Sequence, residues 1–439
     1  QLLDLITIFI FALGIVIMGL SFSGKGRNMK SFFAAGGAVP WAMSGLSLFM
    51  GFFSAGTFVV WGSIAYSLGW IAISIQWTMA IAGFVVGFFI APRWHKTSAL
   101  TVAEYITRRL GVNTQKTYTY LFLFISLFTT GSFLYPVAKI VEVSTGMPLD
   151  LCILLLGGFC IVYVAAGGLW AVVSTDVLQF IILTAAVLIV VPLSFGRVGG
   201  VVNFIESIPA TYFNLVNGEY TIGFIIAFGV YNAIFLGGNW AYVQRYASVN
   251  SQSSARKVGF LFGGLYVVSA VLWMLPPMIY RIVNPSLSTI DAEGAYLMMC
   301  KEVLPAGLLG LMLSGMVFAT ASSLNATLNI SSGVVTNDIF KRLFPQSSDK
   351  TLMRVARIST IIFGLLAIIV ALLIPLMGGI VNVVISVAAL TGVPLYLPII
   401  WTLFSKRQTE YSVITTTLVS LGANAFFKFI TPLWGFGFN

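Results

Sequence analysis

The sequence predicts an all-α integral membrane protein with about twelve transmembrane helices, and three observations carry that prediction. First, 59% of its 439 residues are hydrophobic and only 8% are charged, whereas a typical soluble domain is roughly 25% charged. Second, apolar runs of about 20 residues, the length that spans a bilayer as a helix, recur along the whole chain. Third, the basic residues gather in alternate loops. We therefore expect the lipid bilayer to surround most of the exterior.

Charged or Gly/Pro-rich loops divide the chain into twelve expected spans. They lie near residues 2–20, 41–66, 70–92, 117–144, 149–168, 175–195, 221–247, 258–280, 306–336, 357–376, 379–403 and 411–430. The first run lacks a basic leading region and is long enough to span, so we expect a membrane helix and no cleavable signal peptide. We expect a short cytoplasmic surface helix within loop 93–117, an outer loop at 281–305, and a single transmembrane domain over 1–439.

The positions of the basic residues predict the orientation. Of the 23 Lys and Arg residues, 18 fall on one side of the spans and four on the other, with Lys139 near the outer end of a span. The 18 are Lys25, Arg27, Lys30, Arg93, Lys96, Arg108, Arg109, Lys116, Arg245, Arg256, Lys257, Lys341, Arg342, Lys350, Arg354, Arg357, Lys406 and Arg407. The positive-inside rule makes this side cytoplasmic and puts the N-terminus outside the cell membrane. The same distribution accounts for the net charge of +10 without a nucleic-acid partner.

The residues offer little for catalysis. The three cysteines are isolated, with neither metal-ligand spacing nor a disulfide framework. The single histidine, His95, lies in a basic loop, and no His/Asp/Glu or Cys cluster falls at membrane depth. We therefore expect no enzyme. A membrane sensor is an alternative to a transporter, but no signalling domain is visible in these 439 residues.

Two expected spans are interrupted near their middles. Residues 44–57 (SGLSLFMGFFSAGT) contain three glycines and four hydroxyl residues, and residues 229–240 (GVYNAIFLGGNW) contain a Gly-Gly pair and two asparagines. Irregular backbone at membrane depth is tolerated only where it lines a protein cavity or binds something. Interrupted spans at matching positions of two halves indicate a transporter site at the midplane. The alternative is that the glycines let helices pack closely.

A third stretch, residues 316–332 (MVFATASSLNATLNISS), is unusually rich in hydroxyl and amide side chains. Residues 319, 322 and 323 share one helical face, so a backbone carbonyl and two hydroxyls there offer oxygen ligands to a hard cation. The hydroxyls can instead bond to carbonyls of their own helix. Asp176 opens the sixth span, where an acid is either functional or a helix N-cap. Lys139 and Glu142 are three apart at an outer helix end, where they neutralise one another.

Four motifs resemble the sodium:solute symporter family over most of the chain. They are FFAAGGAVPWAMSGLSLF at 32–49, YVAAGGLWAVVSTDVLQ at 163–179, VQRY at 243–246 and SSLNATLNISSGVVTNDIFKR at 322–342. The resemblance implies an inverted-repeat (5+5) fold like that of a bacterial leucine transporter. The two repeats are then expected at 41–195 and 221–404, with 2–20 a lead-in helix and 411–430 a trailing one, and family members often have further helices.

The resemblance also implies where sodium binds. The family's principal site maps onto the carbonyls of Met50, Phe53 and Ala319 and the hydroxyls of Ser322 and Ser323. A second site, found in some members, matches Asp176 and Ser322. Its other two positions, usually hydroxyls, are Asn325 and Ala326 here, so a second ion is left open. Proton coupling is a variant, and Asp176 is the acid it requires.

The expected solute site draws on the same resemblance. Its residues face the midplane: Ser54, Thr57, Gln76, Thr129, Asn232, Phe235 and Tyr266. Thr129 replaces the arginine with which sialic acid transporters hold a carboxylate, which argues against a sialic acid unless another cation substitutes. Asn232 matches a sugar-contacting Asn of the galactose transporter. Phe235 stands where that transporter has a gating Tyr, and Tyr266 stands where it has a Lys. The expectation is sodium symport of a small polar solute, a sugar, polyol or sugar acid; a carboxylate, amino acid or vitamin is the alternative.

Overall fold

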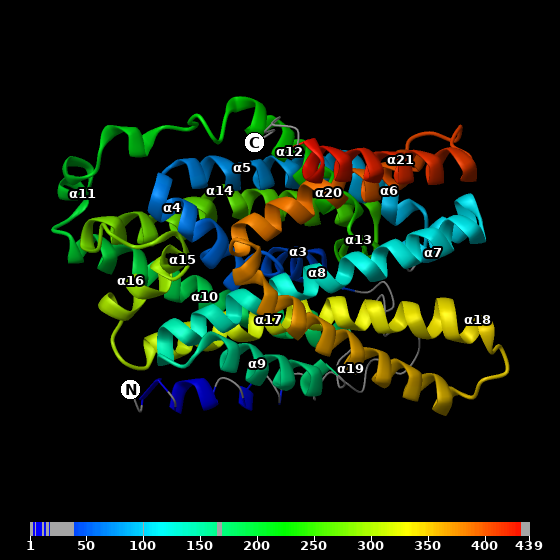
Figure 1. Cartoon of the computed structure of the whole chain (residues 1–439), viewed down its shortest axis with the longest axis horizontal. Helices are drawn as coiled ribbons and strands as arrows, with labels where there is room; N and C mark the ends of the chain where they lie inside the picture. The colour runs from blue at the N-terminus through cyan, green and yellow to red at the C-terminus, as the bar shows by residue number, and fades with distance from the viewer. Residues whose placement is uncertain are drawn as a thin grey trace.

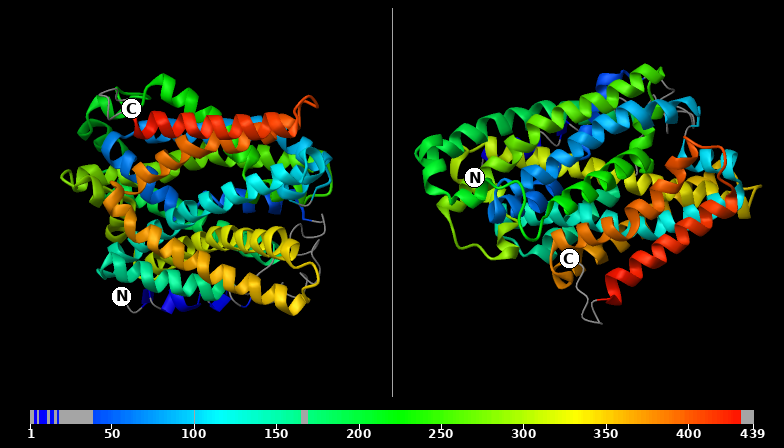
Figure 2. Two further views of the ribbon diagram at one scale, coloured as in Figure 1. Left: turned by 45° about the vertical axis from the view of Figure 1, so that its right-hand side comes forward. Right: turned by 90° about the horizontal axis from the view of Figure 1, so that it is seen from above.

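The computed structural model describes residues 39–99, 101–164 and 169–431, together with ten residues between 3 and 17. Every regular element within them is a helix, which confirms the all-α prediction for that part of the chain (Figure 1). The helices run side by side along the longest axis of the molecule, as the two further views also show (Figure 2). Six of the described helices are long and apolar enough to cross a membrane, or seven if one bent pair is a single span. The count of twelve spans stays a prediction.

The first half of the described chain contains one interrupted helix and the long helices that follow it. Its elements are α3 (Trp41–Met50), η2 (Thr57–Trp61), α4 (Gly62–Leu68), α5 (Ile71–Val85), η3 (Val86–Ile90), α6 (Ala91–Lys96), α7 (Val102–Leu110), α8 (Val112–Thr145), α9 (Leu149–Val164), α10 (Leu169–Arg197), α11 (Val201–Ser207) and η4 (Ala210–Phe213). Helix α7 is the short helix expected in loop 93–117. The Thr101 hydroxyl caps it by accepting the Glu104 amide at 3.1 Å.

The second half repeats the pattern of an interrupted helix followed by long ones. Its elements are α12 (Ile222–Gly238), α13 (Trp240–Ala247), α14 (Gln252–Val283), α15 (Thr289–Ala292), α16 (Ala295–Val303), α17 (Leu308–Gly333), η5 (Val334–Phe340), α18 (Lys341–Leu343), α19 (Asp349–Leu373), η6 (Ile374–Met377), α20 (Ile380–Thr402) and α21 (Glu410–Phe429). The short helices α15 and α16 occupy the outer loop expected at 281–305. The repeat boundaries stay a prediction.

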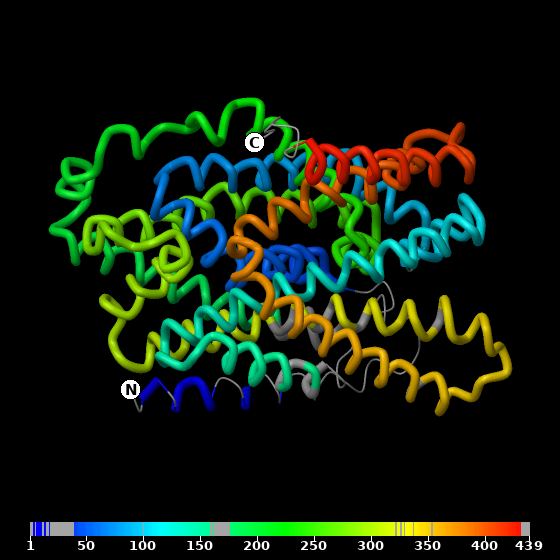
Figure 3. The backbone as a smooth tube through the Cα atoms, viewed as in Figure 1, coloured from blue at the N-terminus to red at the C-terminus, as the bar shows by residue number. Residues whose placement is uncertain are grey.

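Both interruptions fall inside the stretches that the sequence marked. Helix α3 ends at Met50 and the chain becomes helical again at Ala55–Gly56 and η2, near the centre of the molecule (Figure 3). Helices α12 and α13 meet at Asn239 with a bend of 59°. The Asn239 side chain caps α13 by accepting the Ala241 amide at 3.0 Å. The glycines and asparagines of these stretches therefore mark true breaks.

The loops that carry most of the basic residues lie at one end of the molecule. Helices α7 and α18 reach the right-hand end in Figure 1 and α6 and α13 lie in its right half, whereas α11, α15 and α16 lie toward the left-hand end. The arrangement agrees with the asymmetry read from the sequence. Which end faces the cytoplasm stays a prediction.

Helix α14 approaches α5 and η3, which directly follows α5, through pairs of glycines. A Cβ atom on Gly259 would lie 2.5 Å from the Cα of Gly87, and one on Gly83 would lie 2.8 Å from the Cα of Gly263. Here the glycines do permit close helix packing. They hold α5 and α14 together as a pair, and these two helices carry Gln76 and Tyr266.

Candidate functional site: a central cavity beside a broken helix

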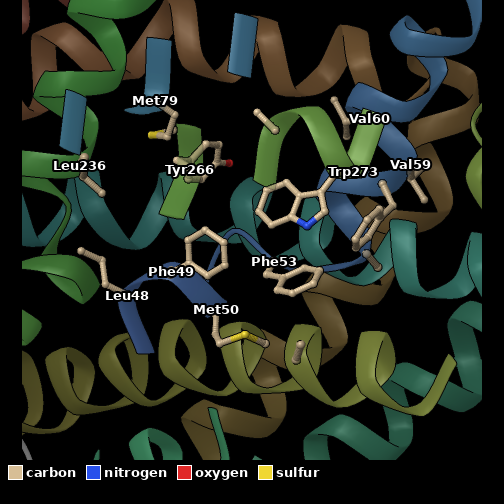
Figure 4. Close-up of a cluster of buried hydrophobic side chains, with 14 of the residues drawn as sticks. Leu48, Phe49, Met50, Phe53, Val59, Val60, Met79, Leu236, Tyr266 and Trp273 are labelled. Atoms are coloured by element: carbon tan, nitrogen blue, oxygen red, sulfur yellow. The ribbon is translucent and has the colours of Figure 1, made fainter. Parts of the chain in front are cut away.

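A cluster of buried aromatic rings surrounds the break between α3 and η2 (Figure 4). The ring centroid of Trp273 lies 4.8 Å from that of Phe53 and 5.4 Å from that of Phe49. Met50 and Phe53 are each 1% exposed. The rings therefore hold the end of α3 in a dry interior, where backbone groups that leave the helix must find other partners.

A cavity of about 180 Å³, here called the central cavity, opens beside this break. Its walls come from the break and η2, α5, α8, α12, α13, α14 and α20. All seven residues expected to contact a solute line it: Ser54, Thr57, Gln76, Thr129, Asn232, Phe235 and Tyr266. They come from five separate parts of the chain, so the fold brings them together as the sequence analysis required. Their role in binding stays a prediction.

No Asp, Glu, Lys, Arg or His side chain is among the described residues that line the central cavity. Its polar side chains are mostly engaged already. The Thr129 hydroxyl donates to the Ser126 carbonyl at 3.2 Å, and the Asn232 amide donates to the Thr78 hydroxyl at 2.8 Å. One exception is Gln76, which is 3% exposed and whose Nε2 has no hydrogen-bond partner among the described residues. A buried unsatisfied donor is costly, and a solute oxygen in the cavity would satisfy it.

Aromatic side chains that were not among the expected solute residues form much of the wall of the central cavity. Tyr231 stacks on Phe235 with ring centroids 5.5 Å apart and planes 17° apart. Tyr242 and Tyr396 meet the other edge of Phe235 at 5.5 and 5.9 Å. Tyr231 lies one helical turn before Phe235, a signal that the sequence contained. Tyr396 lies on α20, and no local pattern relates it to the break.

The residues expected to hold sodium lie where α17 meets the break. The amides of residues 51–53 donate to the carbonyls of Leu48 and Phe49, so none of these bonds uses the Met50 carbonyl. Ala319 is 1% exposed, and the Ser323 hydroxyl lies 3.4 Å from its carbonyl oxygen. The Ser322 side chain lies outside the described part of the structure. Carbonyls and hydroxyls are the ligands that a hard cation prefers.

A hydrogen bond ties the two sides of this region together. The Ala55 amide, within the break, donates to the Thr320 hydroxyl at 3.1 Å. Thr320 belongs to the stretch at 316–332 that is rich in hydroxyl side chains, but the sequence predicted no role for it. The hydrogen bond between Thr320 and Ala55 depends on which turn of α17 faces the break, and this cannot be predicted from the local sequence.

A second, smaller cavity of about 70 Å³ adjoins the central cavity and shares Thr129, Phe235 and Tyr242 with it. Asp176 and Ser323 both line this adjoining cavity, together with Arg245. Asp176 lies seven residues inside α10, which begins at Leu169, so the alternative that it is a helix N-cap is wrong.

Asp176 belongs to a buried chain of polar groups. The Ser47 hydroxyl donates to the Asp176 carboxylate at 2.6 Å, and Arg245 Nε donates to the Ser47 hydroxyl at 3.3 Å. Arg245 is 7% exposed and Asp176 is 3% exposed. The chain of contacts links α13, α3 and α10 and brings a cation close to the acid. Asn325, the other expected ligand of a second sodium ion, has a side chain outside the described part.

Comparisons with known proteins point to one family. The model of the sodium:solute symporter family matches residues 32–419. The sodium/glucose cotransporter of Vibrio parahaemolyticus is 28% identical over 472 residues, which cover 98% of this chain and 86% of that protein. The sodium/myo-inositol cotransporter 2 of Mus musculus is 26% identical over 468 residues, covering 95% of this chain and 68% of the relative. These relatives are transporters and not enzymes.

The fold agrees with that of a solved symporter. A Na+-coupled sialic acid symporter, solved substrate-bound in an outward-open state, superposes with a TM-score of 0.74. The match covers 97% of each chain at 21% identity. The two chains thus share one overall fold. The chain belongs to the sodium:solute symporter family.

Proposed function

We propose that this chain is a sodium-coupled symporter of the cell membrane that carries a small, uncharged, polar organic solute into the cell by alternating access. A sugar or polyol fits best. The observation that carries the proposal is that seven residues from five parts of the chain meet in one cavity beside the break, whose described lining contains no charged side chain. The named substrates of the relatives, glucose and myo-inositol, are uncharged polyhydroxylated rings of the same class.

In this proposal the solute accepts a hydrogen bond from Gln76 and packs against the rings of Phe235 and Tyr266. Aromatic faces favour the apolar C–H face of a ring, and amides and hydroxyls orient its oxygens. Asn232, whose amide donates to Thr78, lines the same cavity. The solute is held by positioned neutral groups with no ion pair.

One sodium ion binds between the break and α17 in our proposal. Its ligands are the carbonyls of Met50, Phe53 and Ala319 and the hydroxyls of Ser322 and Ser323. A second ion at Asp176 and Asn325 is the alternative, and it would have to compete with Arg245, which reaches Asp176 through Ser47.

The driving force of one ion is sufficient for strong accumulation. One charge moving down about 100 mV releases about 2.3 kcal/mol, and a tenfold sodium gradient adds about 1.4 kcal/mol. Together they support an accumulation ratio of several hundred-fold, and a second ion would roughly square it.

A sugar acid or other carboxylate is the second candidate, and one observation favours it. Arg245 borders the adjoining cavity, which shares Thr129, Phe235 and Tyr242 with the central one as lining residues. A carboxylate that reached past these residues would meet its guanidinium. Against this, the guanidinium already faces Asp176 through Ser47.

A thermal-shift panel tests the proposal. Sugars, polyols, sugar acids, amino acids and monocarboxylates are added to the purified protein in sodium and again in potassium. A ligand stabilises the folded protein by RT ln(1 + [L]/Kd), so we expect a shift with a neutral sugar or polyol, larger in sodium. Shifts confined to carboxylates would favour the second candidate. Solute-induced shifts of equal size in sodium and potassium would contradict sodium coupling.

A further inference from the structure

Thr320 is the one described side chain of α17 that hydrogen-bonds to the break at residues 51–56. Its hydroxyl oxygen accepts the Ala55 amide at 3.1 Å and its proton is donated to the Met316 carbonyl at 2.9 Å. The donation to Met316 fixes the rotation of the hydroxyl and leaves a lone pair for Ala55. Thr320 is 1% exposed and Ala55 is fully buried. The contact is therefore specific and dry.

The Ala55 amide needs a partner from outside its own segment. When a helix breaks, the first amides of the second half lose the carbonyls that would have preceded them. Ala55 is the first residue to become helical again after the break. Ala55 is fully buried, so an unpaired amide there would be costly. Thr320 supplies the missing acceptor.

The bond lies beside the place where we put sodium. Thr320 follows Ala319 directly, and Ala55 follows Phe53 by two residues. We propose that Thr320 is a positioning residue of the principal sodium site. It holds the break at the separation from α17 at which one ion can bridge the two, and it does not touch the ion. This inference rests on the proposed function.

The hydrogen bond and the ion act on the same pair of elements. Each one holds the break against α17. When one is present, the break and α17 are already ordered relative to one another, so the other forms at a smaller loss of conformational entropy. Binding events that favour the same arrangement reinforce one another. Removing the Thr320 oxygen should therefore weaken sodium binding although every proposed ligand stays in place.

The test compares Thr320→Val with a matched control on the same polypeptide stretch. Valine keeps the shape and removes the acceptor. Thr336→Val makes the same change at a buried threonine whose described hydrogen bond is to its own helix, to the Ser332 carbonyl at 2.7 Å. Thr320→Ser restores the hydroxyl without the methyl group. The readout is the sodium concentration that gives half-maximal thermal stabilisation and half-maximal solute uptake.

We expect Thr320→Val to raise that concentration about tenfold, the factor that one lost buried hydrogen bond corresponds to. Thr320→Ser and Thr336→Val should stay within about twofold of the wild type. A Thr320→Val protein with wild-type sodium dependence would overturn the inference, as would equal effects of Thr320→Val and Thr336→Val.

Two further arms keep the result unambiguous. Should Thr320→Val fail to fold, Thr320→Cys replaces it, because a thiol is a weak acceptor of similar size. It is expected to give an intermediate rise, and wild-type behaviour of Thr320→Cys would again overturn the inference. A wild type that shows no sodium dependence at all refutes the proposed function itself. If the wild type depends on sodium but substitutions at position 320 leave that dependence unchanged, only the role of Thr320 is refuted.

Discussion

The Tyr135 hydroxyl donates a hydrogen bond of 3.0 Å to the carboxylate of Glu293. The other carboxylate oxygen of Glu293 accepts the Ile380 amide at 3.2 Å, at the first residue of α20. Glu293 lies between α15 and α16 and is 4% exposed. The outer segment is thereby tied to α8 and α20, two helices that wall the central cavity.

This buried carboxylate should make stability depend on pH. Burial raises the pKa of Glu293 above its ordinary value of 4.5, although the Ile380 amide, the Tyr135 hydroxyl and the charge of Lys139 oppose that rise. The folded state therefore holds the proton more tightly than the unfolded chain. The stabilisation is complete below about pH 4.5 and is lost as the pH rises through the folded pKa.

Glu293→Gln removes this titration. We expect the Tm of the wild type to fall relative to that of Glu293→Gln as the pH is raised from about 4.5, in thermal unfolding scans at constant salt. Asp291→Asn changes an exposed carboxyl in the same segment and is the control. Parallel pH profiles of the wild type and Glu293→Gln would show that Glu293 does not titrate in this way.

Gln76 is the second position at which we predict an effect. Its Nε2 is buried without a partner and borders the central cavity. Gln76→Ala should therefore weaken binding of the solute about tenfold, the loss of one hydrogen bond, with little change in sodium affinity. Ser74→Ala, on the same helix and outside the cavity lining, is the control. A solute Kd from ligand-dependent thermal shifts that is unchanged in Gln76→Ala would remove this residue from the site.

Asp176 tests the number of sodium ions. Because Ser47 donates to its carboxylate and Arg245 donates to Ser47, we expect sodium-titrated uptake with a Hill coefficient near one in the wild type and in Asp176→Asn. Ser47→Ala breaks the link to Arg245 but keeps the acid. A wild-type coefficient near two that falls to one in Asp176→Asn would establish the second site.

The glycine contact between η3 and α14 predicts a large difference in stability between two alanine substitutions on α14. An alanine at position 259 would place its Cβ 2.5 Å from the Cα of Gly87, whereas nothing lies within 4 Å of a Cβ at position 264. Gly259→Ala should lower stability by about 1–3 kcal/mol through overpacking. Gly264→Ala should be neutral or slightly stabilising, since alanine favours helix. Equal Tm values for the two variants would mean that the helices do not approach this closely.

The sequence was a good guide wherever a local pattern has a local cause. Gly51 and the Gly237–Gly238 pair marked the two breaks, because glycine lowers the cost of leaving a helix. The seven expected solute residues could be grouped because the family resemblance fixed which helix faces turn toward the midplane. The basic residues fall in alternate loops of the sequence, which predicted that these loops would lie at one end of the molecule.

The sequence was a poor guide to contacts that tertiary packing creates. The bond from Ala55 to Thr320, the chain from Arg245 through Ser47 to Asp176, and the Tyr396 ring in the cavity wall each join elements more than 100 residues apart. Asp176, which follows Ser174 and Thr175, was expected to open a span, yet helix α10 begins at Leu169 and continues through these residues. The burial of Asp176 depends on helices that are distant in sequence, and no local sequence pattern predicts which helices pack against it.

The most direct test of the central claim is solute accumulation in proteoliposomes under an inward sodium gradient, with Ser322→Ala and Ser323→Ala combined as the matched variant. We expect the wild type to accumulate the solute only when sodium is outside, with no accumulation when potassium replaces it. The double variant should lose that sodium dependence. Accumulation by the wild type without a sodium gradient, or a sodium dependence that survives in the double variant, would contradict the account.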